Sequence, residues 1–409
     1  MPNHFGTDAV WRSWTNVTRC WGRVAGILVL VATLLLGSFG APVGAVVFDV
    51  PNVESAILVV ADTGQVLFEK NADTPLPPAS LVKMMTMLLT VEAVEQGLIN
   101  WSDVVTVSPR AAAIDGSQIW VAAGDTLTVS QLLAAVAIHS ANDASIALAE
   151  HISGTEQAFV DWMNRRAQQL GMVNTRFINA HGWDRDYEGE SRMSARDAMI
   201  VARELILKYP DILDFTREPE MWLGPTGTRN PIRLENTNQL VRDASRNVDG
   251  LKTGFTNEAG YLLVATEERD GMRLISVVMR AETSEIRYAE TRRLLNFGFT
   301  HEYVQVGEAG KTFPVEIAQA VGTAEVYLAE PLMVLAPRSS VVDIQVEVLL
   351  KDGIRAPLKA DTEVGEVVVT VDGREVGRAP AYLTADVRRQ GFFARAWNAT
   401  LNFFTNLFQ

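Results

Sequence analysis

The sequence predicts a domain of mixed helices and strands, followed by a small domain made only of strands. Between Ser55 and Phe297, runs with helical periodicity alternate with β-rich runs that short turns join. From about Val304 the pattern changes, because short β-rich runs are separated by proline or Asp-Gly and no long helical run intervenes. The 409 residues are enough for two cores. We therefore expect an α/β (α+β) domain at residues 46–303 and an all-β domain at residues 304–387.

Turn residues and apolar periodicity locate the individual elements of both domains. The strands expected in the first domain are residues 55–60 and 65–69, which form a hairpin, and residues 260–267 and 273–279, which a turn at Asp270-Gly271 joins. The expected helices are a run from Met84 that ends at Gly97, and residues 128–138, 143–152, 157–170, 194–209 and 285–297. The strands expected in the second domain are residues 325–328, 332–335, 342–350 and 364–371.

Residues 1–45 read as a secretory signal peptide rather than as part of the fold. Three arginines precede an apolar run from Ala25 to Leu36, and small residues follow up to Ala45, where we expect cleavage. The alternative is an uncleaved membrane anchor, but the run is short for one. The only cysteine, Cys20, would leave with the signal, and a mature chain without cysteine suits an oxidising compartment.

Residues 388–409 predict an amphipathic helix at the C-terminus. On a helical wheel, the aromatic and leucine side chains from Phe392 to Phe408 share one half, and Arg395, asparagines and Gln409 share the other. Such a helix lies in a membrane surface, because it is too short and too polar to span one. The alternative is a helix that docks on its own protein. With the signal peptide, the tail predicts a location at the periplasmic face of the inner membrane.

Charge and residue usage exclude several classes of function. The formal net charge of −13 disfavours nucleic-acid binding, which needs a basic surface. Neither the single cysteine nor the five histidines show the spacing of metal ligands. We therefore expect no metal site and no cofactor.

The stretch from Pro77 to Thr86 carries the first motif with catalytic chemistry. Its two prolines suit the entry of a helix, so Ser80 lies in the first turn and Lys83 follows on the same face. The free N–H groups of the helix start lie beside the serine hydroxyl. Serine is a weak nucleophile until a base removes its proton, and a lysine kept neutral by burial is such a base. This S-x-x-K arrangement occurs in serine acyl-enzymes, although four residues alone also match by chance.

Two further motifs supply partners for this pair. Ser140-Ala141-Asn142 lies in a break between two helices, where a hydroxyl can relay a proton and an amide can position a carbonyl. Lys252-Thr253-Gly254 begins a strand, where the lysine and threonine suit a carboxylate and the glycine allows close approach of a substrate backbone. A second S-x-N occurs at Ser245-Arg246-Asn247. It lies so close to Lys252 in the sequence that it cannot form a separate wall of the active site, so we reject it as the second motif.

The three motifs, in this order, resemble those of the low-molecular-mass penicillin-binding proteins, the serine-type D-alanyl-D-alanine carboxypeptidases. The stretches 78–86, 140–143 and 247–254, continuing to Tyr261, are similar to that family. The resemblance runs from about Ser55 to the C-terminus and includes the β-domain and the tail. It implies a penicillin-binding, transpeptidase-like domain, in which an antiparallel sheet is flanked by helices.

The resemblance also implies a role for each motif residue. Ser80 would be the acylated nucleophile, Lys83 its base, Ser140 the proton relay and Asn142 the substrate-orienting amide. Lys252 and Thr253 would hold the terminal carboxylate of the substrate, and the N–H groups of Ser80 and Phe255 would form the oxyanion hole. The implied partners are a peptidoglycan pentapeptide as substrate and β-lactams as inhibitors. Many family members have a histidine after K-T-G, and Phe255 in this place keeps the N–H but loses a side-chain contact to substrate.

Three other functions fit parts of the pattern. A DD-endopeptidase would cut peptide crosslinks with the same motifs. A class A-like β-lactamase would need a deacylating glutamate, but Glu218-Pro219-Glu220-Met221-Trp222 lacks the asparagine that should end that element and lies far beyond Ser140. A non-catalytic peptidoglycan-binding protein would not be acylated by penicillin.

Overall fold

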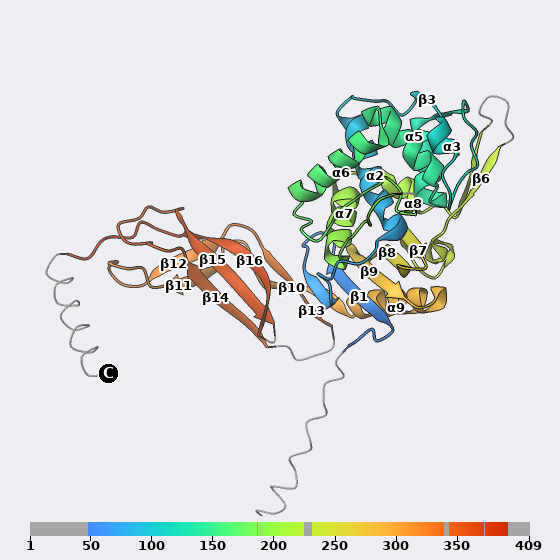
Figure 1. Cartoon of the computed structure of the whole chain (residues 1–409). Helices are drawn as coiled ribbons and strands as arrows, with labels where there is room; N and C mark the ends of the chain where they lie inside the picture. Colours follow the sequence, from blue (N-terminus) through green and yellow to red (C-terminus); the bar gives the residue numbers. More distant parts are fainter. Residues whose placement is uncertain (1–47, 186, 225–230, 339–342, 372, 392–409) are drawn as a thin grey trace, which may run out of the picture. The chain divides into compact units, whose positions relative to one another are not determined.

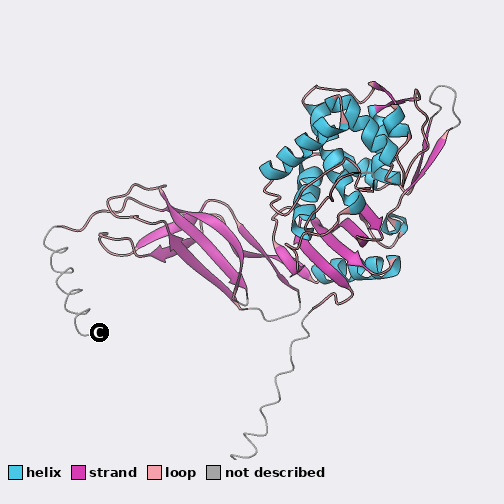
Figure 2. Ribbon diagram, in the orientation of Figure 1, coloured by secondary structure: helices cyan, strands magenta, loops and turns pink. Residues whose placement is uncertain are grey.

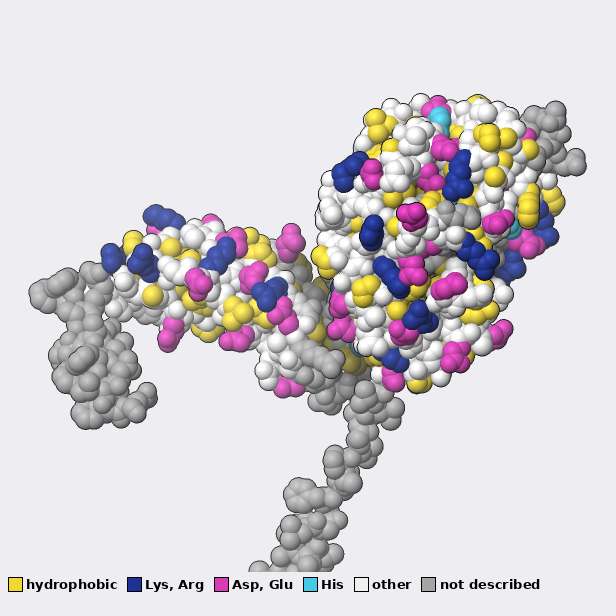
Figure 3. Space-filling view, viewed as in Figure 1, with side chains coloured by type: hydrophobic (Ala, Val, Ile, Leu, Met, Phe, Trp, Pro, Cys, Tyr) yellow, Lys and Arg dark blue, Asp and Glu magenta, His cyan; other side chains and the backbone are white. Residues whose placement is uncertain are grey.

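The computed structural model describes residues 48–185, 187–224, 231–338, 343–371 and 373–391, and the structural statements below concern these residues (Figure 1). The predicted signal peptide and the apolar tail from Phe392 onward lie outside them. Among the helices described, none is long and apolar enough to cross a membrane. On the face shown in Figure 3, acidic and basic side chains are interspersed, so the described residues form no uniformly basic surface there.

A five-stranded antiparallel sheet forms the centre of the first domain (Figure 2). In spatial order its strands are β2 (Val66–Lys70), β1 (Val53–Val60), β9 (Met272–Ala281), β8 (Gly260–Arg269) and β7 (Val248–Thr256). The predicted N-terminal hairpin is present and joins β9. The predicted turn between β8 and β9 is also present, with φ of 50° at Asp270 and 76° at Gly271. Because β7 is the last strand in this order, it lies at an edge of the sheet.

Helices cover both faces of this sheet (Figures 1 and 2). Helix α9 (Ser284–Gly298) packs on one face, and α7 (Ala195–Lys208) packs on the other. Because both faces are covered, every residue of β9 from Leu274 to Met279 is buried, and no alternation of polar and apolar residues remains. Ser194 caps α7 as predicted, since its Oγ accepts the Asp197 N–H at 3.1 Å.

Helix α2 (Lys83–Glu95) is the centre of the helical part of this domain. Each of its residues from Lys83 to Ala93 is buried, which is expected for a helix that is apolar on all sides. The other helices and turns are α3 (Pro109–Ala112), α4 (Val129–Ala134), α5 (Asn142–Ser153), α6 (Glu156–Gln169), α8 (Leu213–Thr216), η1 (Ala79–Val82), η2 (Ala135–His139), η3 (Pro210–Ile212) and η4 (Gln239–Arg242). Two short antiparallel pairs complete the domain: β3 (Val104–Thr106) with β4 (Thr126–Thr128), and β5 (Glu220–Leu223) with β6 (Ile232–Glu235).

The predicted break between two helices is present, but the helix before it differs from the expectation. Residues 128–138 were expected to form one α-helix, whereas α4 ends at Ala134 and a π-helical turn, η2, continues to His139. Ser140 then adopts a left-handed conformation, with φ of 65° and ψ of 30°, and α5 begins at Asn142. A π-turn adds a residue to the helix, so it turns the following side chains toward a different direction.

The second domain is built only from strands, as predicted. Its sheet has the order β11 (Thr312–Val315), β12 (Ala324–Leu328), β16 (Arg374–Leu383), β15 (Glu363–Val371) and β14 (Ile344–Leu350), and β10 (His301–Gly307) pairs with β13 (Leu332–Pro337). A core of apolar side chains, including Val326, Leu328 and Val367, holds these strands together.

The β-domain continues past Val387, where we had expected the tail helix to begin. The backbone N–H of Val321 donates to Arg388 O at 3.0 Å, and the N–H of Gln390 donates to Gln319 O at 2.8 Å. Arg389 also pairs with Ala320. Residues 388–390 are therefore extended rather than helical, because their backbone groups are bonded to the β-domain.

Candidate active site

Ser80 and Lys83 meet at the start of α2. Ser80 lies in the 3₁₀ turn η1, and Lys83 is the first residue of α2. The Lys83 Nζ lies 3.0 Å from Ser80 Oγ, so the two side chains predicted to be neighbours are within hydrogen-bonding distance.

Two carbonyl oxygens fix the Lys83 amine. Nζ donates to Asn142 Oδ1 and to the backbone oxygen of His181, both at 2.7 Å, and the side chain is fully buried. Burial holds the pKa of Lys83 well below its usual value, and the positive charge of Lys252 lowers it further, while Asp143 acts in the opposite direction. A neutral amine has two N–H groups, which these two carbonyls take up. Its lone pair is then left for the Ser80 hydroxyl proton.

The helix break positions Asn142 and Ser140. The Asn142 Nδ2 donates to Asp115 O at 2.6 Å, and its backbone N–H donates to Ser117 O at 2.7 Å. These two bonds fix the amide so that its oxygen faces Lys83. Ser140 is only 4% exposed and precedes Asn142 in the left-handed position after η2.

Strand β7 brings Lys252, Thr253 and Gly254 to the serine turn. A Cβ added at Gly254 would lie 3.1 Å from Pro78 O and 3.4 Å from Ala79 Cβ, so the glycine allows β7 to pack against η1. Lys252 is buried and its Nζ donates to Thr253 O at 3.1 Å, while the Thr253 hydroxyl donates to Thr237 Oγ1 at 2.7 Å. Burial and the nearby charge of Arg287 lower the pKa of Lys252 to about 7.

Arg287 is a residue of this region that sequence reasoning missed. It comes from α9 and is 6% exposed, and its guanidinium lies over the rings of Tyr261 and Tyr288, 5.5 and 4.4 Å from their centroids. Its terminal nitrogens donate to Leu262 O at 3.4 Å and to Ser284 Oγ at 3.1 Å, whereas its Nε is buried without a hydrogen-bond partner, and no described carboxylate forms an ion pair with it. A buried cation without an ion-pair partner is costly, so Arg287 is a candidate group for binding an anion. No sequence motif connects Arg287 to Lys252.

His181 was also missed as part of the site. Its ring is buried, with Nδ1 accepting the Trp183 N–H at 3.1 Å and Nε2 lying 2.9 Å from Tyr187 Oη. Burial holds the pKa of His181 well below its usual value, and the charge of Arg110, with that of Lys83 in its protonated form, adds to this effect. The neutral ring thus donates from Nε2 to Tyr187, which fixes the backbone carbonyl that accepts from Lys83.

Two positions from the sequence analysis remain: Phe255, and the S-x-N motif at Ser245-Arg246-Asn247 that we rejected. The Phe255 side chain is 47% exposed and its ring centroid lies 4.3 Å from that of Tyr261. Ser245 bonds to Asp243 through its hydroxyl at 2.6 Å, and Arg246 binds Glu267, so these residues have structural partners of their own. We therefore keep this S-x-N motif outside the active site.

This fold and this site define a class: a serine acyl-transfer enzyme with a buried lysine beside the serine. The model of the D-alanyl-D-alanine carboxypeptidase family matches residues 48–283, and that of the C-terminal domain of penicillin-binding protein 5 matches residues 290–389. The chain belongs to the D-alanyl-D-alanine carboxypeptidase family, the low-molecular-mass penicillin-binding proteins. The predicted family and enzyme class are thus confirmed.

Similar proteins agree with this assignment. The chain is 39% identical over 344 residues to the D-alanyl-D-alanine carboxypeptidase DacF of Bacillus subtilis, covering 83% of this chain and 87% of DacF. It is 35% identical over 362 residues to DacC of Escherichia coli, covering 86% and 88%. The crystal structure of penicillin binding protein 5 from Haemophilus influenzae superposes with a TM-score of 0.69 at 32% identity, covering 83% of this chain and 98% of that one. A D-alanyl-D-alanine endopeptidase of Pseudomonas aeruginosa is more distant, at 27% identity over 64% of this chain.

Proposed function

We propose that this enzyme removes the terminal D-alanine from peptidoglycan pentapeptides through an acyl-enzyme on Ser80. The observation that carries the proposal is the bonding of Lys83. Asn142 and His181 take up both N–H groups of its neutral amine, and Ser80 Oγ lies 3.0 Å from the same nitrogen. A buried amine with a lowered pKa in this position is a general base for the serine.

The reaction then has two halves. In the first, Lys83 Nζ takes the Ser80 proton while Oγ bonds to the carbonyl carbon of the penultimate D-alanine. The N–H groups of Ser80 and Phe255 are assigned to the developing oxyanion. Ser140 passes a proton to the leaving nitrogen as the amide C–N bond breaks, and D-alanine departs. In the second half, Lys83 takes a proton from a water whose oxygen bonds to the ester carbon, and it returns this proton to Ser80 Oγ as the ester C–O bond breaks and the tetrapeptide leaves.

The substrate lies along the free edge of β7 in this proposal. An extended peptide can bond to an edge strand as an additional strand. Its terminal carboxylate would be held by Lys252, Thr253 and Arg287, two buried cations and a hydroxyl. A β-lactam with a carboxylate would bind at the same groups and acylate Ser80.

The products distinguish this activity from that of an endopeptidase. We expect the mature enzyme to convert a pentapeptide ending in D-Ala-D-Ala into the tetrapeptide and free D-alanine, which mass spectrometry detects. A crosslinked peptide dimer serves as the comparison substrate. Cleavage of the dimer without release of D-alanine from the pentapeptide would refute the carboxypeptidase assignment.

We also propose that the protein acts at the periplasmic face of the inner membrane and is held there by its C-terminal tail. The support is the sequence from Phe392 to Phe408, with aromatic side chains on one half of a helical wheel. Each phenylalanine moved fully out of water contributes about 1.5–3 kcal/mol, and less at an interface. Because the β-domain continues to Gln390, the informative truncation ends at Gly391. We expect the mature chain to float with anionic liposomes and the truncated chain to stay at the bottom. Equal sedimentation of both would contradict the anchor.

A further inference from the structure

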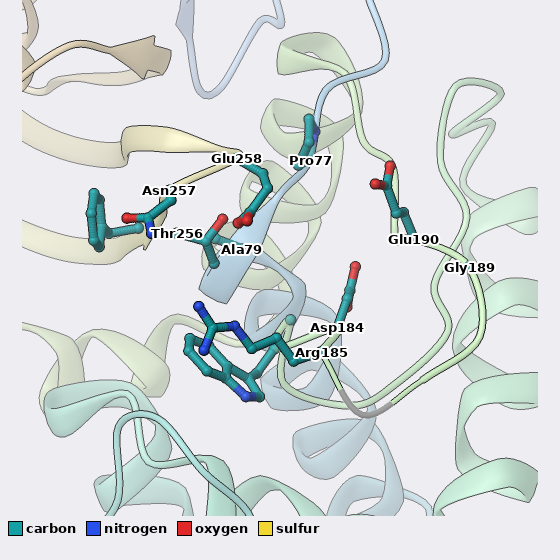
Figure 4. A pocket seen from close by; sticks show the side chains of 12 residues that line it. Pro77, Ala79, Asp184, Arg185, Gly189, Glu190, Thr256, Asn257 and Glu258 are labelled. Carbon is teal, nitrogen blue, oxygen red and sulfur yellow. The ribbon is translucent and has the colours of Figure 1, made fainter.

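A pocket of about 310 Å³ opens beside the serine turn (Figure 4). Ala79 and Gly182 line it, and a Cβ added at Gly182 would lie 3.1 Å from the Ser80 nitrogen. One wall is the segment that ends β7, from Phe255 to Glu258, and the other lining residues are Pro77 and, from the loop after Gly182, Trp183, Asp184, Arg185, Gly189 and Glu190.

The position of the pocket indicates which part of a substrate reaches it, and this step rests on the proposed function. The terminal carboxylate lies at Lys252 and Thr253, near the middle of β7. A peptide that runs antiparallel to β7 therefore extends past Phe255 toward Glu258. The residue that enters the pocket is the one before the D-Ala-D-Ala pair.

Two of the four charged groups around the pocket already have partners. The Asp184 carboxylate accepts the Asn179 Nδ2–H and the Ser191 N–H, each at 2.7 Å. Glu190 forms an ion pair with Arg192. These two carboxylates thus shape the loop.

The other two charged groups, Arg185 and Glu258, are free to bind a ligand. The Arg185 guanidinium stacks 5.0 Å from the centre of the Trp183 ring, and it forms no ion pair with any described residue. The carboxylate of Glu258 likewise forms no ion pair with a described residue, and Arg280 Nη2 donates to the Glu258 backbone oxygen at 2.9 Å. Figure 4 shows the two side chains coming from opposite walls. Among the lining side chains, the pocket therefore presents one carboxylate and one guanidinium that have no ion-pair or hydrogen-bond partner among the described residues.

The wall that carries Arg185 is anchored from behind. Tyr187 Oη donates to Glu156 Oε2 at 2.7 Å, and Arg110 Nη2 donates to Tyr187 Oη, also at 2.7 Å. Gly182 packs directly on the Ala79 carbonyl. A loop fixed on both sides of Trp183 loses little conformational entropy when a ligand binds.

We propose that this pocket selects the side chain of the residue before D-Ala-D-Ala, and that it prefers a side chain ending in an ammonium and a carboxylate on one carbon. Glu258 binds the ammonium and Arg185 binds the carboxylate. In peptidoglycan stem peptides, meso-diaminopimelate has this chemistry, whereas lysine supplies the ammonium alone.

The test uses three acetylated peptides that end in X-D-Ala-D-Ala, with meso-diaminopimelate, L-lysine or Nε-acetyl-L-lysine at X. The kcat/KM for D-alanine release should be roughly tenfold higher with diaminopimelate than with Nε-acetyl-lysine, and intermediate with lysine, because each partly exposed ion pair gives up to about fivefold. Glu258→Gln should remove the advantage of lysine over its acetylated form. Arg185→Gln should remove the advantage of diaminopimelate over lysine. Glu188→Gln, an exposed carboxylate of the same loop outside the pocket, should keep all three ratios.

The controls separate this proposal from the proposed function. If the wild-type enzyme is acylated by penicillin and releases D-alanine equally fast from all three peptides, the pocket is not selective and the proposal is wrong. Ratios that stay unchanged in Glu258→Gln and Arg185→Gln would overturn it as well. If the wild-type enzyme is neither acylated nor releases D-alanine, the proposed function and this inference both fail.

Discussion

Replacing Gly182 by alanine should damage the active site more than the fold. A Cβ on Gly182 would lie 1.8 Å from the carbonyl oxygen of Ala79 and 3.1 Å from the Ser80 nitrogen. Real Cβ contacts start at 3.0 Å, so this carbonyl has to move by about 1.2 Å, and the Ser80 backbone has to move with it. Because a 1 Å displacement of a reacting group can reduce the rate by about 10²-fold, we expect a loss of that order in acylation by penicillin.

The assay is the second-order rate constant of acylation, measured by the growth of the penicillin adduct, with thermal unfolding measured in parallel. Gly182 has φ of 83°, where alanine costs about 1–2 kcal/mol. Gly171 is the matched control, because it has φ of 78° and no atom within 4 Å of an added Cβ. Gly171→Ala should therefore lose only the stability that this φ costs and retain its acylation rate. If Gly182→Ala acylates as fast as Gly171→Ala, the packing of this loop does not position Ser80.

Three further predictions concern the cations of the site. Lys83→Arg should lose at least about 10²-fold in acylation rate, because arginine stays charged and cannot accept the serine proton; a rate near that of the wild type would refute Lys83 as the base. The kcat/KM for D-alanine release should rise with pH as Lys83 loses its proton and becomes a base. It should fall again near pH 7, because the pKa of Lys252 is about 7 and neutral Lys252 no longer attracts the substrate carboxylate. Lys252→Arg should remove that fall, and an unchanged pH profile would show that Lys252 does not cause it. Arg287→Gln should reduce kcat/KM about tenfold or more through the lost bond to the carboxylate, and it should move the fall to higher pH, because the Arg287 charge lowers the pKa of Lys252. A loss of activity without this displacement would indicate only structural damage.

The sequence predicted which secondary-structure elements carry the motif residues, because interactions between neighbouring residues determine these elements. The prolines before Ser80 and the apolar run after it place the serine at a helix start, and the Asp270-Gly271 turn aligns β8 with β9. The spacing of Ser80 and Lys83 is also local, since both lie within one turn. The approach of β7 to η1 was not predicted: the sequence analysis assigned the missing side chain of Gly254 to the approach of a substrate backbone, whereas in the structure it allows β7 to pack against η1.

Contacts between distant segments could not be predicted in this way. Arg287 lies in a helix whose sequence shows ordinary amphipathic periodicity, and only the packing of α9 under the sheet buries it near Lys252. The second carbonyl that bonds Lys83 belongs to the backbone of His181, and a backbone group leaves no signature in the sequence. The π-turn before Ser140 was missed because its residues have the composition of an ordinary α-helix.

The most direct test of the central claim is the mass of the intact protein after reaction with benzylpenicillin. The account predicts one covalent adduct on the wild-type enzyme, located at Ser80 by peptide mapping, and none on Ser80→Ala. An adduct on Ser80→Ala, or one mapped to another residue of the wild type, would contradict the assignment of Ser80 as the nucleophile.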